Sequence, residues 1–283
     1  MQTLETIIRE TRRRVEGQKA REPLAGVRAK AERMAGVEPC RGFVDALRAR
    51  ATAGSAAIIA EVKRKSPSAG WMRPEYASEG FVPEDIAQAY ERAGAAAISC
   101  LTDGPFFGGD ASYIGRIKQR VSLPVLRKDF VVDVWQVFES RVMGADAVLL
   151  MAECLGPGAL EECAAAAVEL GLGVLLEIHD EANFERALGV FGSHPGAMLL
   201  GVNNRDLSTM KVDLSHTLRL AGRVPDAGWL VSESGIRTPQ DLAALRACGV
   251  RMALVGEYMM KQPEPGKALE ALLGEGGPEA EAK

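Results

Sequence analysis

Eight short apolar segments recur along the chain, and the stretches between them have the spacing of amphipathic helices. The apolar segments are residues 57–63, 95–101, 124–128, 145–151, 173–178, 197–203, 229–234 and 251–256. The helical stretches are residues 84–93, 111–121, 134–143, 157–170, 181–188, 214–223, 239–247 and 264–273. Continuous apolar runs are typical of parallel strands buried on both faces, and parallel strands need right-handed crossovers. The repeat therefore predicts an α/β fold, a closed (β/α)8 TIM barrel.

An open, doubly wound sheet is the structural alternative to the barrel. Such a sheet binds ligands at a switch point, often through a glycine-rich turn after the first strand. No GxGxxG follows the first apolar segment. Glycines after several helical stretches, at Gly94, Gly144, Gly171 and Gly249, are expected to end helices in the left-handed conformation.

The chain divides into three parts by pattern. Residues 1–45 read as an N-terminal helical extension, interrupted at Pro23, that caps the barrel. Residues 46–273 form the predicted barrel. Residues 274–283 are polar and rich in Gly and Glu, which predicts a disordered tail.

Composition excludes several classes of function. The chain has 283 residues and a net charge of −4. It therefore lacks the excess positive charge that is typical of proteins that bind nucleic acid or a membrane surface. No apolar run is long enough for a transmembrane helix, and residues 1–14 are too polar for a secretory signal. The five cysteines are scattered, without metal-binding spacing, so we expect free thiols, no metal or other cofactor and a cytoplasmic protein. Local cationic clusters at 63–65 and 127–128 suggest a small anionic ligand.

Charged residues gather at the ends of the apolar segments, where a barrel has its active site. Glu61 and Lys63 lie two residues apart on the first segment, so both side chains should point to the same face. Five of the other segments carry a polar or charged residue at or beside their ends: Lys128, Glu177, Asn203, Glu233 and Glu257. A single lysine at a strand end is usually solvated, but several such ends together predict a catalytic cavity. His179 is expected to lie behind the site rather than to act as a base.

A phosphate site is predicted after the last two strands. Gly235 and Gly256 would let backbone N–H groups approach an anion, and residues 257–260 could form a short helix beside it. The loop that begins at Arg64 is rich in Ser, Pro and Gly, which predicts a mobile lid. Phe107, between a second Phe and two glycines, is expected to face an aromatic substrate.

These residues together resemble the indole-3-glycerol phosphate synthase family of tryptophan biosynthesis. The matching strings are Ile59-Ala60-Glu61-Val62-Lys63-Arg64-Lys65-Ser66-Pro67-Ser68, Leu101-Thr102-Asp103 with Phe106-Phe107, Pro124-Val125-Leu126-Arg127-Lys128-Asp129-Phe130, Gly201-Val202-Asn203-Asn204-Arg205-Asp206-Leu207 and Ser232-Glu233-Ser234-Gly235-Ile236. The resemblance covers almost the whole chain. Glu153 departs from it, because a small apolar residue is expected there; its carboxylate would perturb a neighbouring lysine or face solvent.

The resemblance implies a carboxy-lyase that acts without a cofactor. It would convert 1-(2-carboxyphenylamino)-1-deoxyribulose 5-phosphate to indole-3-glycerol phosphate, CO2 and water. Lys128 is the expected proton donor, with a pKa lowered by desolvation. Glu177 would stabilise cationic intermediates and act as acid and base, and Lys63 would hold the substrate carboxylate. Glu61, supported by Asn203, would position Lys63.

The remaining implied roles concern binding. Substrate would contact Ser66, Phe107, Phe130, Arg205, Glu233 and Ser234, and its phosphate would contact Lys63, Gly235, Gly256 and Glu257. The N-terminal helices would close one side of the cavity. The implied partner is this small phosphorylated aromatic substrate, with no nucleic acid or membrane, and a monomer is favoured.

Two alternatives remain open at this stage. A Schiff-base aldolase could use Lys128 or Lys63 as its nucleophile. A non-catalytic binding barrel would keep the phosphate loops but has no need for acid and base groups.

Overall fold

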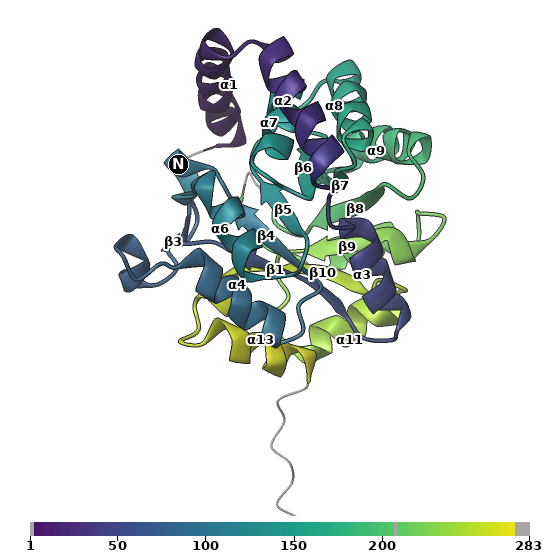
Figure 1. Ribbon diagram of the computed structural model, residues 1–283. Coiled ribbons are helices and arrows are strands. Elements are labelled where there is room, and N and C mark those ends of the chain that lie inside the picture. Colours follow the sequence, from purple (N-terminus) through teal and green to yellow (C-terminus); the bar gives the residue numbers. More distant parts are fainter. Residues whose placement is uncertain (1–2, 207–208, 275–283) are drawn as a thin grey trace, which may run out of the picture.

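The chain forms a closed barrel of eight parallel strands, as Figure 1 shows for the computed structural model, which describes residues 3–206 and 209–274. The barrel strands are β1 (Ala57–Val62), β4 (Ala97–Leu101), β5 (Val125–Lys128), β6 (Ala147–Met151), β7 (Gly173–Ile178), β8 (Met198–Asn203), β9 (Leu230–Glu233) and β10 (Met252–Val255). Each strand pairs in parallel with the next in the chain, and β1 closes the ring by pairing with both β4 and β10. The predicted TIM barrel is confirmed.

The strands are buried on both faces, which is why their sequences read as continuous apolar runs. In β6 and β9, for example, all residues are buried. The observed strands start up to two residues later or end one residue earlier than predicted in most cases. The difference lies at the strand ends, where the hydrogen-bonded ladder stops before the apolar run in the sequence does.

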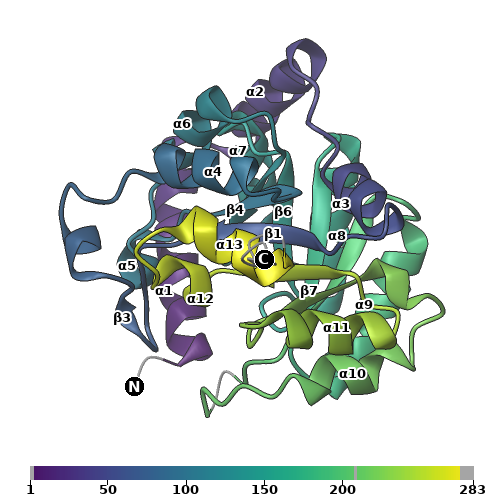
Figure 2. The same ribbon diagram turned by 90° about the horizontal axis from the view of Figure 1, so that it is seen from below.

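Helices surround the barrel between the strands. They are α4 (Pro83–Arg92), α6 (Ser112–Arg120), α7 (Val134–Val142), α8 (Pro157–Glu169), α9 (Glu181–Ser193), α10 (Ser215–Ala221), α11 (Pro239–Ala247) and α13 (Pro265–Leu273). Figure 2 shows α13 beside α4, the two helices that meet where the chain closes the ring. The predicted glycine stops hold, since Gly94, Gly144, Gly171 and Gly249 all have positive φ.

The N-terminal extension reaches both ends of the barrel. Its helices are α1 (Leu4–Arg21), α2 (Leu24–Val37) and α3 (Phe43–Thr52), and α2 packs against α7. Phe43 is buried against Gly173 at the start of β7, so α3 covers the amino end of the strands. Helix α1 instead reaches the carboxyl end, as described below. The predicted division at residue 45 falls inside α3.

Several short elements were not predicted. They are β2 (Lys65–Ser66), β3 (Gly70–Trp71), η1 (Pro74–Ala77), α5 (Gly104–Phe107) and η2 (Ala227–Trp229); the predicted short helix after the last strand is present as α12 (Glu257–Met260). The lid loop is thus an antiparallel hairpin of β2 and β3. Arg64 holds this loop, donating to the carbonyls of Tyr76 and Ser78. Mobility of the loop stays a prediction.

The other predictions concern the termini and membrane spans. Residues 275–283, nearly all of the predicted disordered tail, lie outside the described residues. Within the described part of the chain, no helix has the length and apolar character needed to cross a membrane.

Candidate active site

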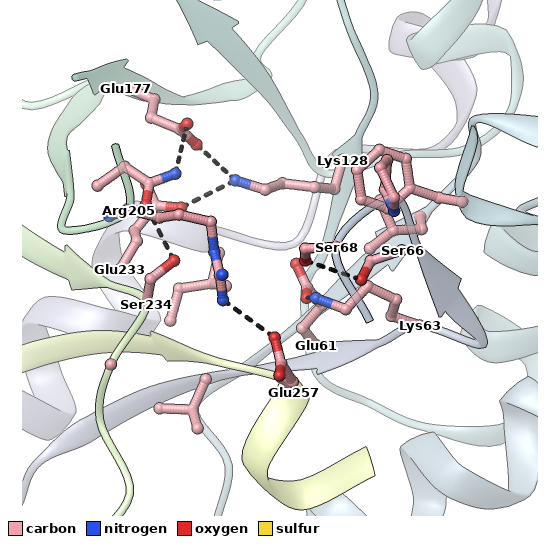
Figure 3. Close-up of a pocket in the computed structure, with 18 of the residues that line it drawn as sticks. Glu61, Lys63, Ser66, Ser68, Lys128, Glu177, Arg205, Glu233, Ser234 and Glu257 are labelled. Atoms are coloured by element: carbon pink, nitrogen blue, oxygen red, sulfur yellow. Dashed lines mark hydrogen bonds and ion pairs between the residues drawn. The ribbon is translucent and has the colours of Figure 1, made fainter. Parts of the chain in front are cut away.

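A cavity of about 370 Å³ opens at the carboxyl ends of the barrel strands (Figure 3). It brings together all the predicted site residues: Glu61, Lys63, Ser66, Phe107, Lys128, Phe130, Glu177, Asn203, Arg205, Glu233, Ser234, Gly235, Gly256 and Glu257. They come from seven of the eight strands and the loops that follow them, with only β6 contributing none. The individual roles assigned to them stay predictions, but their convergence on one rim is a feature of the structure.

Glu61 and Lys63 form an ion pair, as their spacing on one strand predicts. Nζ of Lys63 lies 2.5 Å from Oε1 of Glu61, and both side chains are largely buried. Gly256 is needed beside this pair, because a Cβ at that position would collide with the Glu61 carboxylate. The glycine therefore makes room for Glu61, in addition to any backbone approach to an anion.

Lys128 lies between two buried carboxylates, as Figure 3 shows. Its Nζ donates to Oε2 of Glu177 at 2.5 Å and to Oε2 of Glu233 at 2.8 Å. Burial alone would lower the pKa of Lys128, but the charges of Glu177, Glu233 and Glu61 outweigh it and raise that pKa. The prediction of a lowered Lys128 pKa is therefore wrong for the free protein, because desolvation was considered without the acidic partners.

Glu177 accepts hydrogen bonds on both carboxylate oxygens. Lys128 occupies Oε2, while Nδ2 of Asn203 donates to Oε1 at 3.0 Å. Burial would raise the Glu177 pKa, yet Lys128 and His179 hold it well below its usual value. The prediction that Asn203 supports Glu61 is wrong, since its amide donates to Glu177.

The pKa of Glu233 is shifted in the opposite direction to that of Glu177. Burial, followed by the neighbouring charge of Glu177, raises the pKa of Glu233 to about 8, and Lys128 only partly opposes this. Two carboxyl groups that share one ammonium cannot ionise independently, so one stays ionised while the other gains a proton more readily. Gly201 on β8 leaves room for Glu233, because a Cβ there would collide with its Oε1.

His179 lines the cavity beside Glu177, two residues further along the chain, so the expectation that it lies behind the site is wrong. Its Nε2 is 3.0 Å from Oε1 of Glu177. Glu153 binds the other side of His179, so the two alternatives considered for Glu153, a lysine partner or solvent, are both wrong. The side chain of Glu153 is 11% exposed.

The candidate phosphate end of the cavity is a tight turn after β9. Ser234 and Gly235 both have positive φ, of 66° and 88°. The strained Ser234 backbone is held by its side chain, whose Oγ donates to Oδ1 of Asn203 at 2.9 Å. Arg205 lies nearby and pairs with Glu257 at 3.0 Å. Burial would raise the pKa of Glu257, but Lys261 and Arg205 lower it.

Apolar side chains line the other part of the cavity. The rings of Phe107 and Phe130 have centroids 6.0 Å apart, tilted by 42°. Leu4 and Ile7 of α1 complete this wall. This contact agrees with the expectation that the N-terminal helices close one side of the cavity, which stays a prediction. Oγ of Ser66, beside them, accepts from the N–H of Ala69 at 3.2 Å and shares a hydrogen bond with Oγ of Ser68 at 3.3 Å.

The cationic clusters only partly belong to the site. Lys63 and Lys128 line the cavity, whereas Arg127, one residue before Lys128, points away into a buried network with Asp129 and Glu139. Successive residues of a strand face opposite sides, which explains the split. Arg64 likewise holds the lid loop instead of facing an anion.

Sequence reasoning missed several residues at the rim. Arg237, Lys261 and Met210 line the cavity, as do the apolar residues of α1. Arg237 could have been found as a cation two residues after Gly235. The α1 residues carried no signal, because an amphipathic helix does not reveal which surface it covers. Among residues 3–206 and 209–274, no group of three or more His, Cys, Asp or Glu is placed to hold a metal ion.

The chain is similar to known proteins over nearly its full length. The family model described as indole-3-glycerol phosphate synthase matches residues 4–272. The indole-3-glycerol phosphate synthase of Polaromonas naphthalenivorans is 48% identical over 255 residues, covering 90% of this chain and 92% of that protein. That of Rhodospirillum rubrum is 47% identical over 264 residues, covering 93% and 96%.

A solved structure of a 3-hexulose-6-phosphate synthase shares the fold. It has a TM-score of 0.59 and 16% sequence identity, and the match covers 77% of this chain and 98% of that one. At this identity the likeness concerns the barrel alone.

Proposed function

The chain belongs to the indole-3-glycerol phosphate synthase family, and we propose that the groups around its cavity carry out the ring closure, decarboxylation and dehydration that form indole-3-glycerol phosphate. The substrate, 1-(2-carboxyphenylamino)-1-deoxyribulose 5-phosphate, combines a phosphate, an aromatic ring and a carboxylate. The observation that carries the assignment is the position of Lys128 between Glu177 and Glu233 inside a cavity with an apolar wall.

Lys128 donates the proton that ring closure needs. The aromatic carbon attacks the ketone, and the ketone oxygen takes a proton as the carbon–carbon bond forms. Because two carboxylates flank this buried ammonium, Lys128 is protonated before substrate binds and can act as a proton donor. The developing alkoxide is a much stronger base than an amine, which makes the transfer favourable.

Lys63 holds the carboxylate that leaves as CO2. Its ammonium is oriented by Glu61 at 2.5 Å, and both line the cavity. Loss of CO2 returns the bonding electrons to the ring and restores its aromaticity. Until CO2 leaves, the ring-closed intermediate carries a positive charge that is delocalised onto its nitrogen. Glu177 remains ionised beside this cation because Lys128 and His179 lower its pKa.

Dehydration requires a proton for the departing hydroxyl and a base for a ring proton. Glu233 suits this task, because a carboxyl group with a pKa of about 8 is partly protonated near neutral pH. Glu177, with its lowered pKa, suits charge stabilisation better than proton transfer. Asn203 fixes Glu177 and the Ser234 turn together.

The phosphate binds on the loops after β9 and β10. Backbone N–H groups of Gly235, Gly256 and Glu257 are the proposed donors, with Lys63 and Arg237 supplying positive charge. Arg205 and Ser234 line the path between the phosphate and the reacting carbons. The aromatic ring of the substrate packs against Phe107 and Phe130, and Ser66 lies beside it on the lid loop.

The Schiff-base alternative is disfavoured by the state of Lys128. A nucleophilic lysine must lose its proton, whereas Glu177 and Glu233 keep this ammonium charged. The partner is a small phosphorylated molecule, which suits a net charge of −4 better than nucleic acid does. The five cysteines are free thiols, which supports a cytoplasmic location, and we propose a monomer, to be checked by light scattering.

A fluorescence assay for indole product tests the assignment. Wild-type protein should convert the carboxyphenylamino substrate, and Lys128→Ala should abolish turnover while still binding substrate. Borohydride with a sugar phosphate should leave wild-type protein unmodified. No indole product from the wild type, or a reduced covalent adduct on Lys128, would reject the assignment.

A further inference from the structure

Glu153 is a largely buried carboxylate with no role in the reaction described above. It lies two residues after β6, on the far side of His179 from the cavity, and it does not line that cavity. Its Oε1 accepts the backbone N–H of His179 at 2.8 Å, and its Oε2 lies 3.3 Å from Nδ1 of the same residue. One carboxylate therefore holds both the backbone and the ring of His179.

His179 transmits this contact to the active site. Its Nε2 lies 3.0 Å from Oε1 of Glu177, and its side chain is only 8% exposed. Because one carboxylate lies within 3.3 Å of each ring nitrogen, the positive charge of the imidazolium is favoured at this position. The pKa of His179 agrees: burial lowers it, but Glu177 and Glu153 raise it to about 10.

We propose that Glu153 is a positioning residue of this enzyme: it fixes His179 as a charged donor, and His179 in turn holds the Glu177 carboxylate in place beside Lys128. This inference rests on the proposed function. The three groups form a line, Glu153–His179–Glu177, that continues to Lys128 at 2.5 Å. Without Glu153 the ring loses one of its two anionic neighbours and the contact that sets its rotation. Glu177 then loses a cationic neighbour that keeps it ionised beside the intermediate.

The ionisable groups around His179 are few in the described part of the chain. Glu177 faces it from β7 and Glu153 from the segment after β6. Helix α1 packs on the outer side of Glu153, where both line a second cavity. The charged residues of α1 that line this cavity are Glu5, Arg9, Arg12, Arg13 and Glu16, and Cys154 also lines it.

The first test is kinetic and uses Glu153→Gln, which keeps the shape of the side chain and removes its charge. We expect kcat to fall by about tenfold or more, as when the partner behind a metal-binding histidine is removed, with a smaller change in KM. Removing the charge of Glu153 should lower the pKa of His179, so that the imidazolium loses its proton at a lower pH than in the wild type. The basic limb of the kcat profile should therefore move to lower pH by about one unit or more.

The matched control is Glu161→Gln. Glu161 also pairs with a histidine, His194, at 3.0 Å, but its side chain is 47% exposed and lies outside the cavity. This variant should keep the wild-type kcat and pH profile. If Glu153→Gln behaves like Glu161→Gln, the inference is overturned, whereas an inactive wild type would overturn the proposed function instead.

Two further measurements separate positioning from a general loss of stability. The chain has only three histidines, so NMR titration of the imidazole signals can follow His179 directly. The His179 pKa should be lower in Glu153→Gln than in the wild type; an unchanged value would contradict the proposal. In a His179→Asn background, adding Glu153→Gln should change kcat by less than about twofold, because the two act through one another. If Glu153→Gln lowers kcat in the His179→Asn background by as much as it does in the wild type, the proposal is also overturned.

Discussion

Replacing Lys128 with methionine should destabilise the protein in a strongly pH-dependent way. The substitution removes the ammonium that lies 2.5 Å from Glu177 and 2.8 Å from Glu233, and leaves two buried carboxyl groups facing each other. Removing one partner of a buried ion pair typically costs about 3–5 kcal/mol. The folded variant can avoid an unpaired charge only by taking up one more proton than the wild type.

The cost of that proton follows from the unfolded pKa of glutamate, about 4.3. At about 1.36 kcal/mol per pH unit, holding a carboxyl group protonated costs roughly 5 kcal/mol at pH 8 and roughly 1 kcal/mol at pH 5. The folded variant binds more protons than its unfolded chain, so its free energy of unfolding falls as pH rises. We therefore expect a loss of about 4–5 kcal/mol at pH 8 and about 1 kcal/mol at pH 5.

Urea unfolding of wild type and Lys128→Met at both pH values, without substrate, measures these differences. Lys267→Met is the control, because Lys267 and its partner Glu264 are both on the surface, and it should leave the free energy of unfolding unchanged at either pH. A loss that is equal at pH 5 and pH 8, or smaller than about 1 kcal/mol at pH 8, would refute the electrostatic account of the site.

Two further substitutions test the surroundings of the cavity. Gly201→Ala should displace Glu233, because the added Cβ collides with its carboxylate; we expect a clear fall in kcat and a loss of about 1–3 kcal/mol in thermal unfolding, and wild-type turnover would contradict this. Arg14→Ala should loosen α1, since Arg14 anchors that helix through Asp129 at 3.3 Å and Asp103 at 3.5 Å. Its KM should rise more than its kcat falls, and unchanged steady-state parameters would show that α1 is not needed to shape the cavity.

The barrel could be predicted from sequence because its signals are local and repeated. Continuous apolar runs recur in each unit and glycine stops in several of them, and the four predicted stops all have positive φ. The ends of the strands were predicted less accurately, because the residue at which a strand ends depends on its pairing with the neighbouring strands of the barrel. The hairpin of the lid loop was missed, since it depends on Arg64 reaching carbonyls of residues 76 and 78.

The composition of the site was predictable, but its electrostatics was not. Parallel strands all bring their carboxyl ends to one rim, so Glu61, Lys63, Lys128 and Glu177 had to converge once the strands were identified. Which carboxylate Lys128 would meet depends on side-chain reach across the barrel, and that decides whether its pKa rises or falls. The partner of Glu153 was hidden for the same reason, because His179 follows the next strand of the barrel, β7.

A crystal structure of the Glu177→Gln variant with bound substrate tests the central claim most directly. The account predicts that Nζ of Lys128 lies within about 3 Å of the substrate's ketone oxygen. It also predicts that the phosphate rests on the turn at Gly235 and Gly256, with the aromatic ring between Phe107 and the strand ends. A ketone oxygen out of hydrogen-bond reach of Lys128, or a phosphate bound elsewhere on the rim, would contradict it.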